Sequence, residues 1–200
     1  MRDWEMTLIK NVGSMKVVSA GIVLILLSTG IVADDFVPGS FSPPRLIFGD
    51  EFVLEPLGPR LVEIDYLAYM SSIDHLQQTF SRGGSWPNEA ITREDAMVDM
   101  QTEQARFVAR KSFAYAVLDN DRAVERGCIY VYPSKKRGFD AVVRLWVTAT
   151  EYENGFDEKL YEWSRNWLAS DWPFSPAAVA FPGRDISWEQ WDSLPEKLDN

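Results

Sequence analysis

The chain has 200 residues, of which 46% are hydrophobic, and its formal net charge is −10. This length is enough for one ordinary domain with a real core and a tail, and the acidity leaves no basic stripe for a nucleic-acid partner. The single cysteine, Cys128, excludes an internal disulfide and a cysteine zinc site, and the single histidine, His75, excludes a multi-histidine metal site. We therefore expect no nucleic acid and no metal ion.

Residues 17–33 form an apolar stretch without a charge, preceded by two lysines and followed by two aspartates. This layout is typical of a signal peptide. The stretch is also near the lower length limit of a membrane-spanning helix, and the positive-inside rule would then place the body outside the cytoplasm. A third interpretation is that the assigned start codon lies too far upstream, so that residues 1–33 are a mistranslated leader. If the start codon is misassigned, the protein is expected to be cytoplasmic. Under the other two interpretations it is exported or membrane-anchored, with membrane contact only through residues 17–33.

Residues 34–50 are rich in Pro, Gly and Ser and predict an extended linker. The folded domain is expected over 51–200. It should open with a strand within 51–59, which is closed by prolines and a glycine. Apolar residues at helical spacing then predict a first helix over 61–76.

The next helix should begin at Thr92, because Thr92 and Asp95 have the spacing of a capping box. It should run to about Lys111. Its acidic first turn and basic last turn suit the helix dipole. Its inward face is expected to hold a set of mainly apolar residues: Ala96, Met97, Met100, Gln104, Phe107 and Val108.

Three consecutive strands are predicted next, over 113–120, 126–133 and 139–150. Alternating side chains, aromatic and β-branched residues, and turn residues at both joints all favour an antiparallel meander. An amphipathic helix over 157–171 follows, with Trp163 and Trp167 in its buried stripe. A short apolar run at 177–181 predicts a last strand.

The order strand, two helices, three antiparallel strands, helix and strand resembles the GNAT acetyltransferase superfamily, which has the acyl-CoA N-acyltransferase fold. The resemblance runs from about Glu51 to Phe181. More specifically, the chain resembles a bacterial group of small GNAT-like proteins of unassigned substrate. The matching segments are FVLEPLGP, YMSSIDHL, FAYAVLDN, GCIYVYP, VVRLWV and WLASDWPF. The resemblance implies an α+β fold with a mixed, mostly antiparallel sheet flanked by helices.

The resemblance also implies an acyl-CoA-dependent N-acyltransferase that acts on an unknown small amine, with acetyl-CoA as the cofactor. In the superfamily the fourth strand splays from the fifth, and the gap admits the pantetheine arm. The corresponding residues here are Val143, Leu145 and Val147, and the diphosphate is expected near Asn154 and Gly155.

The diphosphate loop departs from the superfamily pattern. It has a single glycine, Gly155, and two carboxylates, Glu151 and Glu153, which would repel a diphosphate. This departure supports an alternative function, a non-catalytic GNAT-shaped binding module that could be exported or membrane-anchored. The expected partners are a small-molecule amine or an acyl-CoA.

Tyr130 and Tyr132 are separated by two positions on one predicted strand, so their side chains point to the same face. Their hydroxyls are candidates for catalytic acid–base work, together with Tyr115 on the neighbouring strand. A packed aromatic sheet face accounts for the same residues.

Arg144 stands between apolar residues of a predicted strand, and a buried arginine needs a partner. It either pairs with Glu125 or Asp140, or forms an anion site for a substrate or cofactor. His75 is the second candidate for substrate contact. It could line a cleft, or it could cap the end of the first helix.

Overall fold

The computed structural model describes residues 36–198, so the apolar stretch 17–33 and the three interpretations of it lie outside the described residues. No helix among residues 36–198 is both long enough and apolar enough to cross a membrane.

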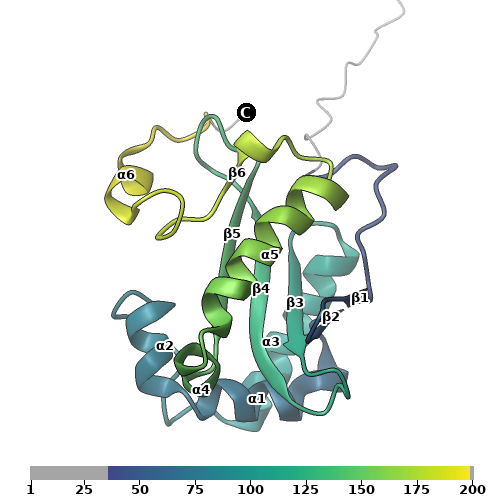
Figure 1. Cartoon of the computed structure of the whole chain (residues 1–200), viewed down its shortest axis with the longest axis vertical. Coiled ribbons are helices and arrows are strands. Elements are labelled where there is room, and N and C mark those ends of the chain that lie inside the picture. The colour runs from purple at the N-terminus through teal and green to yellow at the C-terminus, as the bar shows by residue number, and fades with distance from the viewer. Residues whose placement is uncertain (1–35, 199–200) are drawn as a thin grey trace, which may run out of the picture. The chain divides into compact units, whose positions relative to one another are not determined.

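The core of the fold is a six-stranded sheet whose strands lie side by side in sequence order (Figure 1). Every neighbouring pair is antiparallel except the last, which is parallel. The strands are β1 (Ile47–Phe48), β2 (Val53–Pro56), β3 (Phe113–Leu118), β4 (Glu125–Pro133), β5 (Ala141–Val147) and β6 (Val179–Ala180). The predicted α+β fold with a mixed, mostly antiparallel sheet is confirmed, and so is the meander.

Helices cover both faces of the sheet, which separates two layers of core. One layer packs α5 against the alternate residues of β3, β4 and β5 that include Tyr115 and Val143. The other packs α1 and the first part of α3 against the opposite residues, which include Cys128 and Trp146. The helices are α1 (Val62–Met70), α2 (Ile73–Thr79), α3 (Arg93–Val108), α4 (Ala149–Glu153), α5 (Phe156–Asp171) and α6 (Trp188–Ser193).

The first predicted helix is two helices in the structure, because the helical conformation is interrupted at Ser71 and Ser72. The Ser71 hydroxyl donates to the Ala68 carbonyl over 2.7 Å, and the Ser72 hydroxyl accepts from the Ala149 N–H over 2.9 Å. Serine side chains compete in this way with the helical hydrogen bonds of the backbone. The break gives α2 its own direction, and its end leads into the loop that contains Phe80.

The capping box of α3 is confirmed. The Asp95 N–H donates to Thr92 Oγ1 over 3.2 Å, and the Thr92 N–H donates to Asp95 Oδ2 over 2.9 Å. Ala96, Met100 and Phe107 are buried as predicted. Val108 is 67% exposed, so its place on the inward face was wrong.

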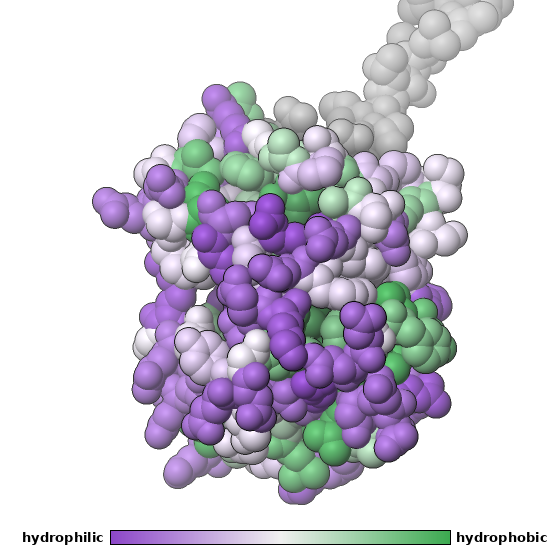
Figure 2. Space-filling view, viewed as in Figure 1, coloured by the Kyte–Doolittle hydropathy of each residue, from purple (hydrophilic) through white to green (hydrophobic). Residues whose placement is uncertain are grey.

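The helix α5 follows its predicted bounds closely, and Trp167 is buried while Trp163 is half-buried. Its outward face is mainly hydrophilic in the space-filling view (Figure 2). The last strand is shorter than predicted, because Pro176–Ala178 form a 3₁₀ turn and only Val179 and Ala180 pair with β5. Ile47 and Phe48, within the expected linker, form β1.

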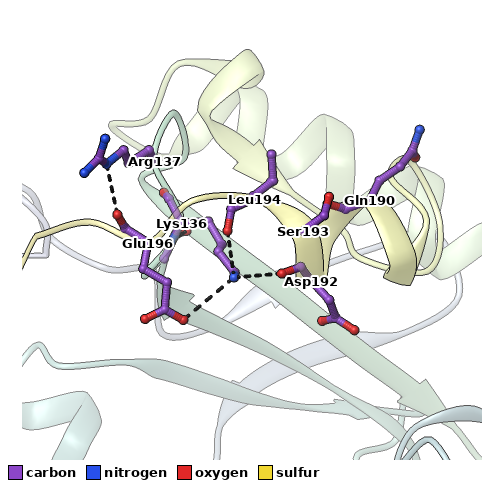
Figure 3. A network of polar contacts seen from close by, with 8 residues as sticks. Lys136, Arg137, Gln190, Asp192, Ser193, Leu194 and Glu196 are labelled. Atoms are coloured by element: carbon purple, nitrogen blue, oxygen red, sulfur yellow. Dashed lines mark hydrogen bonds and ion pairs between the residues drawn. The ribbon is translucent and has the colours of Figure 1, made fainter.

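The tail after β6 is fixed to the turn between β4 and β5 (Figure 3). The Lys136 ammonium donates to the Asp192 and Leu194 carbonyls over 3.3 and 3.0 Å, and Arg137 Nε donates to the Glu196 carbonyl over 2.9 Å. The Asp192 carbonyl belongs to the last turn of α6, and the Leu194 and Glu196 carbonyls follow it, so the cation also meets the negative end of the helix dipole. The tail therefore holds α6 beside the sheet.

Candidate functional site

The parallel strands β5 and β6 pair at only two positions, Ala141 with Val179 and Val142 with Ala180. Beyond these positions β6 ends and β5 continues to Val147. A pocket of about 310 Å³, here called the slot, opens where the pairing stops. Its lining comes from β5, from the segment after β6, and from the helices beside them: Thr79, Phe80, Val143, Arg144, Leu145, Tyr152, Asp157, Phe181, Pro182, Gly183, Arg184 and Trp188.

The segment before α5, predicted as a loop, is the short helix α4. It begins after Thr148, whose side chain caps it by accepting from the Glu151 N–H over 3.3 Å. Gly155 then provides the left-handed turn, at φ 75°, that starts α5. The chain thus presents a helix N-terminus at this end of the slot.

Two of the carboxylates near this helix N-terminus, Glu151 and Asp157, have cationic partners, whereas Glu153 has none among the described residues. Glu151 pairs with Arg126 over 2.7 Å. Asp157, in the first turn of α5, receives two N–H bonds from Arg184 over 2.9 and 2.8 Å. The repulsion that the sequence predicts for a diphosphate is therefore partly offset, but both guanidinium groups are already engaged.

A second pocket, of about 290 Å³, lies between α1, α3, β4 and the loop that holds Phe80 and Trp86. It is called the acidic pocket, because three of its lining residues are Asp65, Asp99 and Glu103. The full lining is Leu57, Asp65, Tyr69, Phe80, Trp86, Ala96, Asp99, Met100, Thr102, Glu103, Arg106, Tyr130, Tyr132 and Arg144.

A buried group of titratable side chains stands behind this pocket. The Cys128 thiol donates to Glu125 over 2.9 Å and lies 3.8 Å from Asp65 Oδ1. Burial raises the pKa of Asp65 to about 7, and raises the pKa of Glu125 and of the thiol well above their usual ranges. The three ligand atoms lie within 4.8 Å of one another, close enough to share a cation. The raised pKa values indicate that protons compensate the buried acids near neutral pH.

Arg144 joins the slot to the acidic pocket, because it lines both, as does Phe80. Its guanidinium donates to the Phe80 carbonyl and lies 4.1 Å from the Phe80 ring centre and 5.5 Å from that of Trp188. No carboxylate of the described residues pairs with it, and burial lowers its pKa. The predicted pairing with Glu125 or Asp140 was therefore wrong.

The two candidate tyrosines lie together in the acidic pocket. Their rings stack with centres 5.8 Å apart and planes 6° apart, and burial raises both pKa values. The Tyr130 hydroxyl accepts from Trp146 Nε1 over 3.4 Å. Tyr115 faces the opposite core layer and donates to the Pro44 carbonyl over 2.9 Å, so it lies outside this pocket.

The other candidates fall into two groups. Val143 and Leu145 line the slot. His75 lies within α2 rather than at its end, and its ring centre is 4.8 Å from that of Tyr152. His75, Val147, Asn154 and Gly155 line neither pocket.

The sequence reasoning missed the acids of the acidic pocket. Asp99 and Glu103 lie on α3, which carries two other acids in its first turn, and a charged helix residue is usually solvated. The only available indication was Asp65 itself, which lies between Ile64 and Tyr66 in a mainly apolar helix sequence.

No family model and no curated protein matches this sequence. Solved structures do match. A protein described as a ribosomal-protein-serine acetyltransferase from Vibrio cholerae is 13% identical, with 64% of this chain and 69% of that chain covered and a TM-score of 0.51. The ribosomal-protein alpha-N-acetyltransferase RimL, in complex with coenzyme A, is 12% identical, with 62% and 68% covered and a TM-score of 0.50. This chain therefore has the fold of the GNAT acetyltransferase superfamily.

Proposed function

We propose that the protein is an acyl-CoA-dependent N-acyltransferase that acts on a small amine. The observation that carries this proposal is the divergence of β5 from β6, which opens the slot on one side of Arg144 and Phe80, while the acidic pocket lies on their other side. In this fold such a gap is expected to admit the pantetheine arm. Two pockets that meet at one point suit a reaction between two bound molecules.

The residues around the slot suit the pantetheine arm of acetyl-CoA better than they suit its diphosphate. The edge of β5 from Val143 onward has no strand partner beyond Val142 on the β6 side, so its backbone groups can bind an amide-containing arm. The diphosphate would be held by the N–H groups that begin α5, beside Arg184. Because Asp157 and Glu158 occupy the same turn, we expect a dissociation constant no better than about 10⁻⁴ M.

Acyl-CoA supplies a thioester, and the balanced reaction converts R–NH₂ and R′C(O)–S–CoA into R–NH–C(O)R′ and HS–CoA. The amine must lose a proton, and the leaving sulfur must gain one. Tyr130 and Tyr132 are the hydroxyls nearest to Arg144 on the facing strand, since Tyr130 lies opposite it. We assign them the donation of a proton to the leaving sulfur, because their raised pKa values keep both hydroxyls protonated, and the tyrosinate so formed takes up the proton that the amine loses.

The test is calorimetry of the full chain with acetyl-CoA. Changing Glu151 and Glu153 to Gln should tighten binding, because the change frees Arg126 and removes negative charge without altering shape. The exposed Glu94→Gln variant, at the start of α3, is the matched control and should bind like the unmodified chain.

Micromolar binding by the unmodified chain would contradict the expected weakness and strengthen the enzyme proposal. No binding at millimolar acetyl-CoA by either form would overturn the acyltransferase proposal and leave the non-catalytic binding module.

A further inference from the structure

Arg144 is a half-buried cation for which the described part of the chain supplies no anion. Its guanidinium donates to the Phe80 carbonyl, and that is its one hydrogen bond within residues 36–198. None of its other nitrogens is among the buried atoms that lack a partner, so they are open where the slot and the acidic pocket adjoin. A guanidinium presents its N–H groups as a fork that matches the two oxygens of a carboxylate. Arg144 can therefore receive a carboxylate from a ligand.

The carboxylates of the acidic pocket differ in how they are partnered. Asp65 hydrogen-bonds with Glu125 and Cys128, so it does not need a ligand. Glu103 pairs over 2.7 Å with an arginine three positions along α3. Asp99 lies at the exposed rim, and no group of residues 36–198 hydrogen-bonds with it or forms an ion pair with it. Two charges therefore remain for a ligand, the guanidinium beside the slot and the carboxylate of Asp99 at the rim.

A ligand with only one kind of charge is mismatched to these two groups. A carboxylic acid would pair with Arg144 but would be repelled by Asp99. An amine would be attracted to Asp99 and repelled by Arg144, and a second ammonium group would increase that repulsion. A zwitterion, which has one carboxylate and one ammonium group, is attracted by both residues. The charges of the pocket therefore favour an amino acid.

Much of the remaining lining of the acidic pocket is apolar. Tyr69 and Trp86 have ring centres 5.5 Å apart, and Trp86 and Phe80 have centres 5.6 Å apart. Leu57 and Met100, which also line the pocket, are buried. The volume of about 290 Å³ is at the lower end of ligand pockets, which hold roughly 300–1,000 Å³. The space suits a small molecule with an apolar side chain.

We propose that the acidic pocket binds a free α-amino acid with an apolar side chain, its carboxylate on the Arg144 guanidinium and its ammonium group on the side of Asp99. The side chain lies among the aromatic rings. A single carbon separates the nitrogen of an α-amino acid from its carboxylate, so the nitrogen stays close to Arg144 and to Tyr130, which lies opposite Arg144 on β4. Acylation of that nitrogen rests on the proposed function; binding of the amino acid does not.

The acylation would convert ⁺H₃N–CHR–COO⁻ and R′C(O)–S–CoA into R′C(O)–NH–CHR–COO⁻, HS–CoA and one H⁺. The ammonium group first releases one proton to water, because only the uncharged amine can attack the thioester. The amine loses its second proton as the bond to the acyl carbon forms, and the leaving sulfur gains a proton. The carboxylate takes no part in these steps, so its role on Arg144 is to position the nitrogen.

The experiment is calorimetry of the full chain with norleucine and three matched ligands. The n-pentylamine ligand lacks the carboxylate, hexanoate lacks the amine, and ε-aminohexanoate is an isomer of norleucine whose nitrogen lies at the far end of the chain. We expect norleucine to bind about tenfold or more tightly than each of the three, roughly the effect of one hydrogen bond between charged groups.

Three variants assign the charges. Arg144→Lys keeps the charge but loses the fork, so it should weaken norleucine and hexanoate about tenfold and leave n-pentylamine unaffected. That unaffected binding also shows that the variant is folded. Asp99→Asn should weaken norleucine and n-pentylamine but not hexanoate, because it removes the charge that the ammonium group faces. The exposed Arg165→Gln variant is the control and should bind all four ligands like the unmodified chain.

Mass spectrometry of the products with acetyl-CoA then separates the two proposals. Norleucine binding without acylation supports this inference and contradicts the proposed function. Four outcomes would overturn the inference, even if some amine is acylated: no heat at millimolar norleucine, equal binding of norleucine and n-pentylamine, tighter binding of ε-aminohexanoate, or an Arg144→Lys variant that loses affinity for acetyl-CoA but not for norleucine.

Discussion

Replacing Asp65 with Asn should change how the stability of the protein depends on pH. Burial raises the pKa of Asp65 from its ordinary value of 3.8 to about 7 in the folded state. The folded state therefore binds more protons than the unfolded state between these values, and the free energy of unfolding falls as pH rises through that window. The contribution is fully present below pH 3.8 and is lost above about pH 7.

The size of the effect follows from the pKa values. At 1.36 kcal/mol per unit, the part of the window between pH 5 and pH 7 corresponds to about 3 kcal/mol. An Asn side chain cannot ionise, so this part of the slope should disappear in the variant. A slope caused by the buried Glu125 should remain but become smaller, because burial is the main cause of its raised pKa and the charge of Asp65 is the second.

Urea unfolding at pH 5, 6, 7 and 8 measures this effect. From pH 5 to pH 8 the Asp65→Asn variant should gain about 3 kcal/mol relative to the unmodified chain. The exposed Asp121→Asn variant is the control, and its stability should run parallel to that of the unmodified chain. If the Asp65→Asn curve also runs parallel, Asp65 is already ionised in the folded protein and the argument from burial is wrong.

Three further predictions concern the packing of two indoles and the hydrogen bonds that hold the C-terminal tail. Trp167→Ala should lower the free energy of unfolding by about 3–5 kcal/mol in urea, because the indole is only 4% exposed. Replacing the half-buried Trp163 should lower it by less. An unchanged melting temperature for Trp167→Ala would show that the buried face of α5 is assigned wrongly. Gly183→Ala should move the Trp188 indole and change its fluorescence, because a Cβ would lie 2.5 Å from Nε1; an unaltered spectrum would contradict the contact. Lys136→Ala should make residues 182–198 the first site of limited proteolysis, since the ammonium holds that tail; equal cleavage rates would refute this.

The sheet could be predicted because its strands carry local patterns. The alternating residues of β3, β4 and β5, with turn residues between them, indicate antiparallel neighbours without knowledge of the rest of the chain. The apolar residues on the buried face of α5 also recur at a spacing that can be recognised from the helix sequence alone. The break at Ser71 and Ser72 could not be predicted with the same rules, because Ser72 is held by the Ala149 N–H, far along the chain.

The candidate site was predicted only in part, for a related reason. Arg144 stood out because a charged residue is unusual within an apolar strand, and Tyr130 because its hydroxyl shares a strand face with that of Tyr132. Asp65 did not, since its burial arises only when α1 packs on Cys128 and Glu125 of β4. Hydrophobic periodicity reports which face of a helix is apolar, but not which acid is enclosed by a distant strand.

The parallel pair of β5 and β6 has a consequence for the order of folding. The meander joins neighbouring segments, whose short loops close at little entropic cost. Val179 reaches Ala141 only after the whole of α5 has been laid across the sheet, as Figure 1 shows. Pairing between distant segments is slow, so the slot should form after the meander. During synthesis the chain can build three strands of the sheet before residues 179 and 180 exist, and in that interval it is folded in part and has no slot.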